Sequence, residues 1–229
     1  MKILAIGAHP DDIEIFMYGF LSVCLKRGDE IYTMIATDGS AGKILEKKNL
    51  KLIRENESIK GLSKLSKPEF LGFPDGKLSL SFEISEIIKN KLNIFKPDLI
   101  VTHSKEDYHP DHRALSENVF NAAGFQFPIL YCDTLMGVNF LPDYFIDITK
   151  HFENKRNAIL AHKSQNPNKF VKAIELQNSF RAGQCNYEIG SYMEAYKFEK
   201  RFPFSEIGML IPYNVNPKPY YKNNLKSLI

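Results

Sequence analysis

The sequence predicts an α/β protein: a Rossmann-like, doubly wound and mostly parallel sheet with helices on both faces, in a single domain. Two observations lead to this fold class. Short apolar runs alternate along the chain with segments of helical periodicity, in the order typical of βαβ units. The chain also has 229 residues, a length that suits one well-buried α/β domain.

The regular alternation lies in the amino-terminal half of the chain. Strands are predicted at residues 2–7, 30–36, 69–72 and 98–102. Each is followed by a segment with helical periodicity, at residues 12–27, 51–65, 81–95 and 110–123. Gly28 is suited to end the first helix, and Ser81 is a suitable N-cap for the third. Because parallel strands need such crossover connections, the alternation predicts a parallel sheet.

The pattern weakens beyond Phe127. Strands at residues 129–132 and 144–148 and helices at residues 149–162 and 169–184 are predicted there. The remainder to Ile229 is rich in Pro and Asn and is expected to wrap over the core. Because the chain shows neither an internal repeat nor a clear linker, we interpret residues 1–229 as one domain with its core in about residues 1–165.

Composition and charge are ordinary for a globular protein and disfavour one class of partner. Hydrophobic residues make up 44% of the chain and charged residues 25%, with a net charge of +3. No Lys/Arg stripe with interleaved aromatic residues stands out, so nucleic acid is not an expected partner. The basic tail from Lys218 to Lys226 is interpreted as a solvated terminus.

The sequence lacks the usual marks of secreted and membrane proteins. No apolar run approaches the length of a membrane span. The chain starts with a strand pattern and lacks a signal peptide's charged start and small-residue cleavage site. Its three cysteines, Cys24, Cys132 and Cys185, are widely spaced, which disfavours a disulfide framework and a Cys-based zinc site. We therefore expect a cytoplasmic protein.

The most informative feature is a His-Pro-Asp motif that occurs twice. His9-Pro10-Asp11-Asp12 follows the first predicted strand, and His109-Pro110-Asp111-His112 follows the fourth. Proline is favoured at the first helical position, so each motif is expected to place its histidine just before a helix. Because an open α/β sheet binds its ligands at the strand ends, neighbouring strands would bring both motifs into one crevice.

Together the two motifs supply three imidazoles and three carboxylates. His9 and Asp12 are three residues apart, as are His109 and His112, so each pair can converge on one point. Asp11 is adjacent to Asp12 and cannot share its direction, so one carboxylate can bind a metal ion while the other approaches its water. Two histidines and one aspartate with a water form a catalytic zinc arrangement, in which zinc acidifies the water and polarises a carbonyl group.

Competing interpretations explain less of the sequence. Helix capping accounts for one motif but not for two at strand ends. A nucleotide-binding Rossmann domain is disfavoured because no GxGxxG follows the first strand. The alternatives left open are a metal-dependent phosphoesterase, although the ligands suffice for one metal rather than a pair, and a non-catalytic sugar-binding protein of the same fold, which would need neither Asp11 nor His109. We expect His103, His151 and His162 to be packing or surface residues, with His103 nearest to the crevice.

The paired motifs, with Ala8 before the first, resemble the signatures of the LmbE-like, or PIG-L, zinc-dependent de-N-acetylases. Weaker similarities to this family lie in Thr37-Asp38-Gly39, Arg54-Glu55-Asn56-Glu57 and His162-Lys163-Ser164-Gln165. Many members continue Asp-Asp-Glu, whereas here Ile13 comes before the acid Glu14. This form resembles the bacillithiol-biosynthesis branch most closely.

The resemblance implies a hydrolase that removes the acetyl group from an N-acetylglucosamine-type sugar conjugate, with one Zn²⁺ per chain. A metal-bound water would attack the acetamide. By their places in the motifs, His9, Asp12 and His112 would bind the zinc ion. The identity of the sugar and its aglycone stays open.

The resemblance also implies roles for the neighbouring residues. Asp11 would be the general base, and His109 would stabilise the oxyanion or act as an acid. Asp111 would orient a histidine, and Arg54 would contact the substrate. The expected partner is a small N-acetylated sugar conjugate, and a homo-oligomer of the chain is left open.

Overall fold

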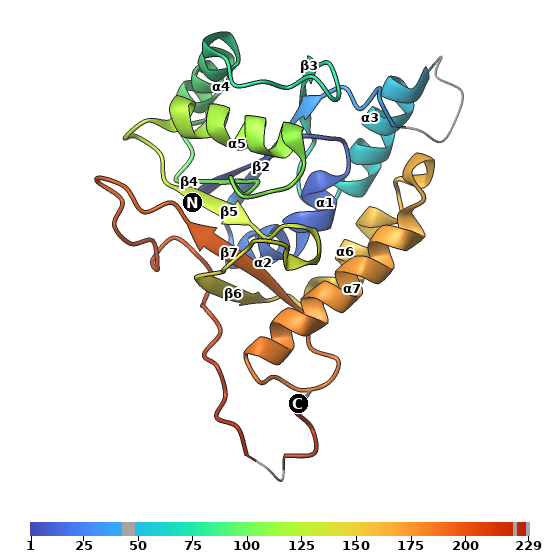
Figure 1. The fold of residues 1–229 in the computed structure, drawn as a ribbon, viewed down its shortest axis with the longest axis vertical. Helices are drawn as coiled ribbons and strands as arrows, with labels where there is room; N and C mark the ends of the chain where they lie inside the picture. The colour runs from blue at the N-terminus through green and yellow to red at the C-terminus, as the bar shows by residue number, and fades with distance from the viewer. Residues whose placement is uncertain (43–48, 222–223, 228–229) are drawn as a thin grey trace.

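The computed structural model describes residues 1–42, 49–221 and 224–227. A seven-stranded sheet with the strand order β3-β2-β1-β4-β5-β7-β6 forms its centre (Figure 1). The strands are β1 (Lys2–Gly7), β2 (Glu30–Thr37), β3 (Glu69–Phe73), β4 (Leu99–Thr102), β5 (Ile129–Cys132), β6 (Tyr144–Asp147) and β7 (Met193–Phe198). Neighbouring strands among β1 to β5 pair in parallel, whereas β7 is antiparallel to both β5 and β6. The mostly parallel sheet predicted from the sequence is therefore confirmed.

Strand β1 lies directly beside β4, the arrangement that brings the two His-Pro-Asp motifs together. Ile3 pairs with Leu99, and Ala5 pairs with Val101. Because both strands run in the same direction, the segments that follow them emerge at the same edge of the sheet. These segments hold the two motifs.

The helices are divided between the two faces of the sheet. They are α1 (Asp12–Phe16), α2 (Tyr18–Arg27), α3 (Leu50–Gly61), α4 (Phe82–Phe95), α5 (Pro110–Ala123), α6 (Phe152–Ile159) and α7 (Pro167–Gln184). Helices α4 and α5 cover one face, while α1, α2, α6 and α7 lie on the other (Figure 1). Alternate side chains of β1 point to opposite faces, since Ile3 and Ala5 join one core cluster and Leu4 and Ile6 join the other.

The single helix predicted over residues 12–27 is wrong, because the chain breaks at Met17 into α1 and α2. The carboxylate of Glu194 in β7 accepts the backbone N–H groups of Gly19 (2.8 Å) and Phe20 (2.7 Å) at the start of α2. Lys155 Nζ lies 2.7 Å from the same carboxylate and balances its buried charge. A side chain 175 residues away in the sequence thus supplies the N-terminal cap of a new helix.

Strand β7 also departs from the prediction, in which the chain after residue 184 only wraps over the core. Its apolar pattern is interrupted by Glu194, whose burial depends on the distant partners just described. Wrapping does occur farther on, where Ile207 and Ile211 are buried against the core. The backbone N–H of Val215 then donates to the Phe145 carbonyl of β6 (2.9 Å).

The other element boundaries lie close to the predicted ones. The predicted helix over residues 149–162 begins as a 3₁₀ turn, η3 (Thr149–His151), and α6 itself ends at Ile159.

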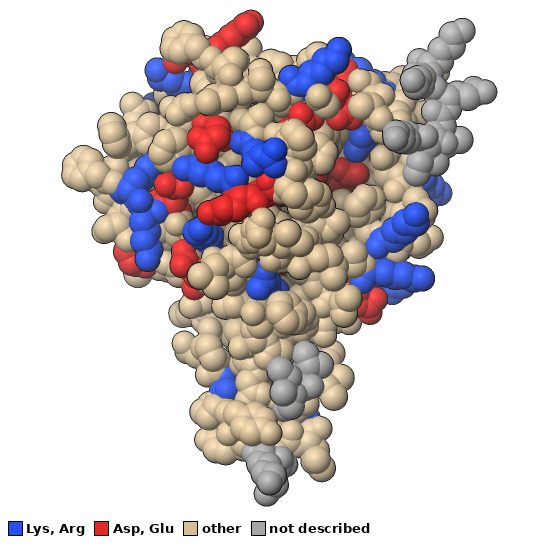
Figure 2. All heavy atoms as spheres, in the orientation of Figure 1, with Lys and Arg blue, Asp and Glu red and all other residues tan. Residues whose placement is uncertain are grey.

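Among the described residues, none of the helices is long and apolar enough to cross a membrane. Charged side chains gather on the broad upper part of the face in Figure 2, whereas the narrow lower end, where the carboxyl terminus lies, is largely uncharged on this face.

Candidate metal centre and active-site pocket

A pocket of about 420 Å³ lies at the carboxyl ends of the parallel strands. Segments that follow each of β1 to β5 contribute to its wall, together with α3, α7 and the 3₁₀ turn η4 (Lys163–Gln165) between α6 and α7. Both His-Pro-Asp motifs reach it, through His9, Asp11 and Asp12 from the first and His109 from the second. This is the edge at which an open α/β sheet is expected to bind a ligand.

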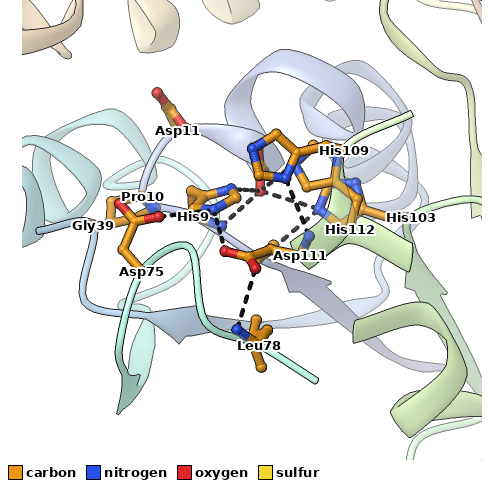
Figure 3. Close-up of polar contacts among 12 residues, drawn as sticks. His9, Pro10, Asp11, Gly39, Asp75, Leu78, His103, His109, Asp111 and His112 are labelled. Atoms are coloured by element: carbon orange, nitrogen blue, oxygen red, sulfur yellow. Dashed lines mark hydrogen bonds and ion pairs between the residues drawn. The ribbon is translucent and has the colours of Figure 1, made fainter. Parts of the chain in front are cut away.

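The first motif forms a sharp turn rather than a helix start at proline. Helix α1 begins at Asp12, as the predicted segment did, so the expectation that His9 directly precedes the helix is wrong. Asp11 occupies the N-cap position with φ 135° and ψ −21°, a strained backbone for a residue with a side chain. The His9 backbone N–H donates to Asp12 Oδ2 (2.6 Å) and closes the turn. Asp12 Oδ2 therefore faces the imidazoles of His9, His103 and His112. Asp11, in contrast, points away from the labelled imidazoles (Figure 3).

The second motif follows the sequence prediction, since Pro110 is the first residue of α5. His109 is the N-cap, and its Nδ1 accepts the backbone N–H of Asp111 (3.2 Å). One turn into the helix, His112 Nε2 lies 3.4 Å from Asp12 Oδ2, which belongs to the first motif. The two helix starts thus meet at Asp12.

Two of the three ligands proposed from the sequence contact the third, although the groups of described residues whose ligand atoms all lie within 4.8 Å of one another are His9–His109–His112, Asp12–His103–His112 and His9–Asp75–Asp111. Asp12 Oδ2 is 3.4 Å from His9 Nδ1 and 3.4 Å from His112 Nε2. The second nitrogen of each ring faces a carboxylate, as metal-binding histidines usually do: His9 Nε2 lies 3.1 Å from Asp111, and His112 Nδ1 lies 2.9 Å from Asp107. Two imidazole nitrogens and a carboxylate oxygen form a donor set that suits a catalytic zinc ion.

The electrostatics of this cluster also fit a cation. Burial disfavours a charged His9, but hydrogen bonds to Asp111, Asp12 and Asp75 outweigh burial and raise the pKa of His9 to about 12. Burial likewise opposes protonation of His112, but Asp12 and Asp107 raise its pKa to about 9. The carboxylates therefore favour positive charge at this point. A divalent cation would release the imidazole protons on binding.

Asp11 has the properties of a general base. Burial raises the pKa of Asp11 to about 6, and the nearby Arg54 guanidinium opposes the rise. Arg54 Nη2 lies 3.2 Å from Asp11 Oδ2. A pKa just below neutrality is well matched to taking a proton from water at physiological pH.

Arg54 lines the pocket, but its guanidinium is occupied by the protein. It donates to the carbonyl groups of Gly39 (3.0 Å) and Pro10 (2.9 Å) as well as to Asp11, and it lies 3.5 Å from Asp75. It is only 4% exposed and does not pair with the acids of its own helix. Gly39, at φ +65°, allows this close approach, because a Cβ there would meet the arginine side chain at 3.0 Å.

The surroundings of His109 disfavour its protonated, positively charged form. Burial, with repulsion from His112 and His9, lowers the pKa of His109. Because Nδ1 accepts the Asp111 amide, the one proton of the neutral ring sits on Nε2. His109 thus keeps one hydrogen-bond donor even when it is uncharged.

Three residues of the site escaped the sequence prediction. Asp75 was not singled out in the sequence, and its Oδ1 lies 3.2 Å from His9 Nε2. Asp107 holds His112, and His103, expected to be a packing residue, is fully buried and stacks on His112 with ring centroids 3.8 Å apart. All three follow the ends of β3 and β4, so the strand-end rule that found the motifs would also have pointed to them.

The other two histidines have no direct part in the cluster. His162 is buried, and its Nε2 lies 2.8 Å from Glu14 Oε1. His151 is half-buried in η3, outside the pocket. The expectation of packing or surface roles therefore holds for these two residues.

Sequence comparisons assign the chain to a protein family. The profile of one family, described as PIG-L: GlcNAc-PI de-N-acetylase, matches residues 4–123, more than half of the chain. The chain is 26% identical over 191 residues to a diacetylchitobiose deacetylase of Thermococcus kodakarensis, covering 72% of this chain and 70% of that protein. It is 29% identical over 174 residues to the uncharacterised deacetylase YaiS of Escherichia coli, covering 71% and 90%. The bacillithiol branch stays a prediction.

Solved structures of similar fold carry out more than one reaction. The N,N′-diacetylchitobiose deacetylase of Pyrococcus horikoshii aligns with a TM-score of 0.76 at 24% identity, covering 89% of this chain and 87% of that one. The 4-carboxy-2-hydroxymuconate hydratase GalB of Pseudomonas putida aligns with a TM-score of 0.77 at 16% identity, covering 90% and 99%. At these identities the likeness establishes the fold, and the reaction has to be argued from the residues of the site.

Proposed function

We propose that this chain, which belongs to the PIG-L family, is a zinc-dependent hydrolase that removes the acetyl group from an N-acetylglucosamine-type sugar conjugate. The observation that carries the proposal is that His9 and His112 both approach Asp12 Oδ2, while Asp11 lies next to Asp12 in the pocket. A binding protein would need the pocket but not a separate base next to the ligands.

In this proposal His9 Nδ1, Asp12 and His112 Nε2 hold the metal ion. Two neutral imidazoles and one carboxylate leave a divalent ion with net positive charge. When bound, such an ion lowers the pKa of a coordinated water and polarises the acetamide carbonyl group. Asp111 and Asp107 fix the orientation of the two rings through their second nitrogens.

Asp11 takes the proton from the water as it attacks the acetamide carbon. Its strained backbone directs the carboxylate away from Asp12 and into the pocket. Arg54 holds the carboxylate from behind and keeps it ionised at neutral pH. These contacts support Asp11 as the base and leave direct contact between Arg54 and the substrate as a further prediction.

His109 donates a hydrogen bond from Nε2 to the oxygen that becomes negative during the attack. The neutral tautomer set by the Asp111 amide is sufficient for this role, as a preorganised donor needs a proton but not a charge. Of the two roles that the resemblance implies for His109, this favours stabilisation of the oxyanion. Asp11, protonated by the first step, is then the donor to the leaving amine, so that one water and one amide give one acetate and one free amine.

Two alternative reactions have to be distinguished from deacetylation by experiment. A phosphoesterase with paired metals needs two independent ligand sets, and two of the candidate groups among the described residues, Asp12–His103–His112 and His9–Asp75–Asp111, share no residue. The hydratase fold match shows that this architecture also accommodates water addition without amide cleavage. An assay of products therefore has to decide between hydrolysis and other reactions.

The test is release of acetate and amine from a panel of N-acetylglucosamine conjugates by the zinc-loaded protein. We expect equal amounts of both products from at least one conjugate, released about 10²–10⁴-fold more slowly by the Asp11→Asn variant. Absence of both products from every conjugate, with zinc bound, would exclude the deacetylase function.

A further inference from the structure

We propose that His103 is a positioning residue of the metal centre, which holds Asp12 and His112 in place for the ion from the buried side of the site. This role rests on the proposed metal centre but concerns metal affinity rather than deacetylation. His103 belongs to neither motif. It is the first residue after β4 and is 0% exposed.

His103 touches two of the three proposed ligands. Its Nε2 lies 3.1 Å from Asp12 Oδ2, the oxygen on which the other imidazoles converge. Its ring stacks on His112 at a centroid distance of 3.8 Å and an interplanar angle of 15°. Figure 3 places it next to His112, on the side away from His9. One side chain thus restrains both ligands, by a polar contact and by packing.

The position of His103 excludes direct contact with substrate. The pocket is lined by His9, Asp12 and His109, but His103 is not among its lining residues. Phe16 packs edge-on against the ring, at a centroid distance of 5.8 Å, and itself lines the pocket. Any effect of His103 on the reaction is therefore transmitted through the ligands.

The nitrogen that faces Asp12 is occupied by protein groups on two sides. The backbone N–H of Ala8 points at the same Nε2, at 3.1 Å. A neutral imidazole has one proton, so Nε2 either donates to the carboxylate or accepts the amide. The bond to the carboxylate is charge-assisted and therefore the stronger of the two. With Asp12 and His112, His103 does form one of the groups that could hold a metal ion. Because the Ala8 amide also lies against Nε2, this nitrogen is assigned to the support of Asp12 and not to the ion.

Packing alone does not explain an imidazole at this position. His103 Nδ1 is buried and has no hydrogen-bond partner among the described residues. An unsatisfied buried nitrogen destabilises the fold, whereas a phenylalanine ring would fill much of the same space without that cost. The polar contact of Nε2 with Asp12 is the property that a phenylalanine would lack.

The experiment compares zinc affinity in His103→Phe and in the matched control His151→Phe. Affinity is measured by competition with a chromophoric chelator, and the absorption spectrum of the Co²⁺-loaded protein reports the ligands. We expect His103→Phe to weaken zinc binding by about 10–100-fold, the usual effect of removing a hydrogen-bond partner of a ligand. The Co²⁺ bands should keep their positions, and His151→Phe should bind zinc as the wild-type protein does.

Two outcomes would overturn the role of His103. Equal zinc affinity of His103→Phe and wild type would make it a packing residue, and a Co²⁺ spectrum that shows a lost ligand would make it part of the coordination sphere. If His103→Phe does not fold, His103→Gln and His103→Ala are compared: the glutamine amide can still donate to Asp12 and should bind zinc more tightly than alanine, and equal affinity contradicts the proposal. A wild-type protein that binds no divalent ion would instead refute the metal centre itself.

Discussion

The two His-Pro-Asp motifs share three residues but differ in backbone and in partners. In the first, Pro10 precedes the helix and Asp11 is held at φ 135°. In the second, Pro110 begins α5, and Asp111 lies in its regular first turn. The same tripeptide therefore forms a strained turn at one strand end and an ordinary helix start at the next.

The two aspartates consequently have different surroundings. Asp11 lies in the pocket with Arg54 as its partner. Asp111 turns across to the other motif, where it contacts His9 Nε2 and accepts the backbone N–H groups of Gly76 (2.7 Å) and Leu78 (3.2 Å). Equivalent positions in a repeated motif thus become a candidate base and a support for a ligand, because the partners across the sheet differ.

The sharpest test of this difference is substitution of the two aspartates. Asp11→Asn is expected to lower kcat by about 10²–10⁴-fold, since the general base is lost. Zinc content should stay near wild type because Asp11 is not a ligand. Steady-state kinetics with metal analysis of the same sample measures both quantities, and a variant with near wild-type kcat, under conditions where chemistry limits turnover, would refute the assignment.

The second motif should show its own contribution to the reaction through His109. His109→Ala is expected to lower kcat by about 10²–10³-fold with little change in zinc affinity, because an oxyanion donor acts mainly in the transition state. Kinetics and chelator competition on one preparation separate the two effects. Loss of zinc from this variant would mean that His109 and His112 have exchanged roles.

Asp111→Asn is expected to affect zinc affinity rather than turnover, the opposite of Asp11→Asn. We expect zinc affinity to fall by about 10–100-fold, because the hydrogen bond that orients His9 is weakened. At saturating zinc, turnover should recover to near the wild-type value, which Asp11→Asn cannot do. Turnover that stays low in the fully loaded variant would show that the two aspartates do not differ as proposed.

The smallest expected effect concerns Arg54. Its positive charge opposes the raised pKa of Asp11, so Arg54→Gln should raise that pKa further and move the acidic limb of the kcat/KM profile up by about one pH unit. Arg54→Lys, which keeps the charge but not the planar fork, is the matched control and should shift the limb less.

The pH profile and KM answer different questions about Arg54. A rise in KM without a shifted limb would favour the substrate-contacting role implied by the family resemblance. If neither KM nor the acidic limb changes, the role of Arg54 is structural: its hydrogen bonds to the Gly39 and Pro10 carbonyl groups hold those two loops together.

Local signals predicted the elements whose ends depend on nearby residues. Helix α5 agrees at both ends, because Pro110 suits a first helical position and Gly124 follows the last. Ser81 caps α4 as expected, with its side chain accepting the Ile84 N–H. The division of the predicted helix at Met17 could not be anticipated, since it is stabilised by Glu194 from a strand far along the chain.

The candidate site shows the same division between local and distant causes. The sequence by itself selected the residues proposed to carry the chemistry, because His-Pro-Asp at two strand ends concentrates imidazoles and carboxylates at one edge of a parallel sheet. Only the tertiary structure decided their partners: His9 meets Asp111 across 102 residues, and His103 meets Asp12 across 91. Such contacts depend on which strands are neighbours and on a turn strained by long-range packing, and neither property is encoded in local spacing.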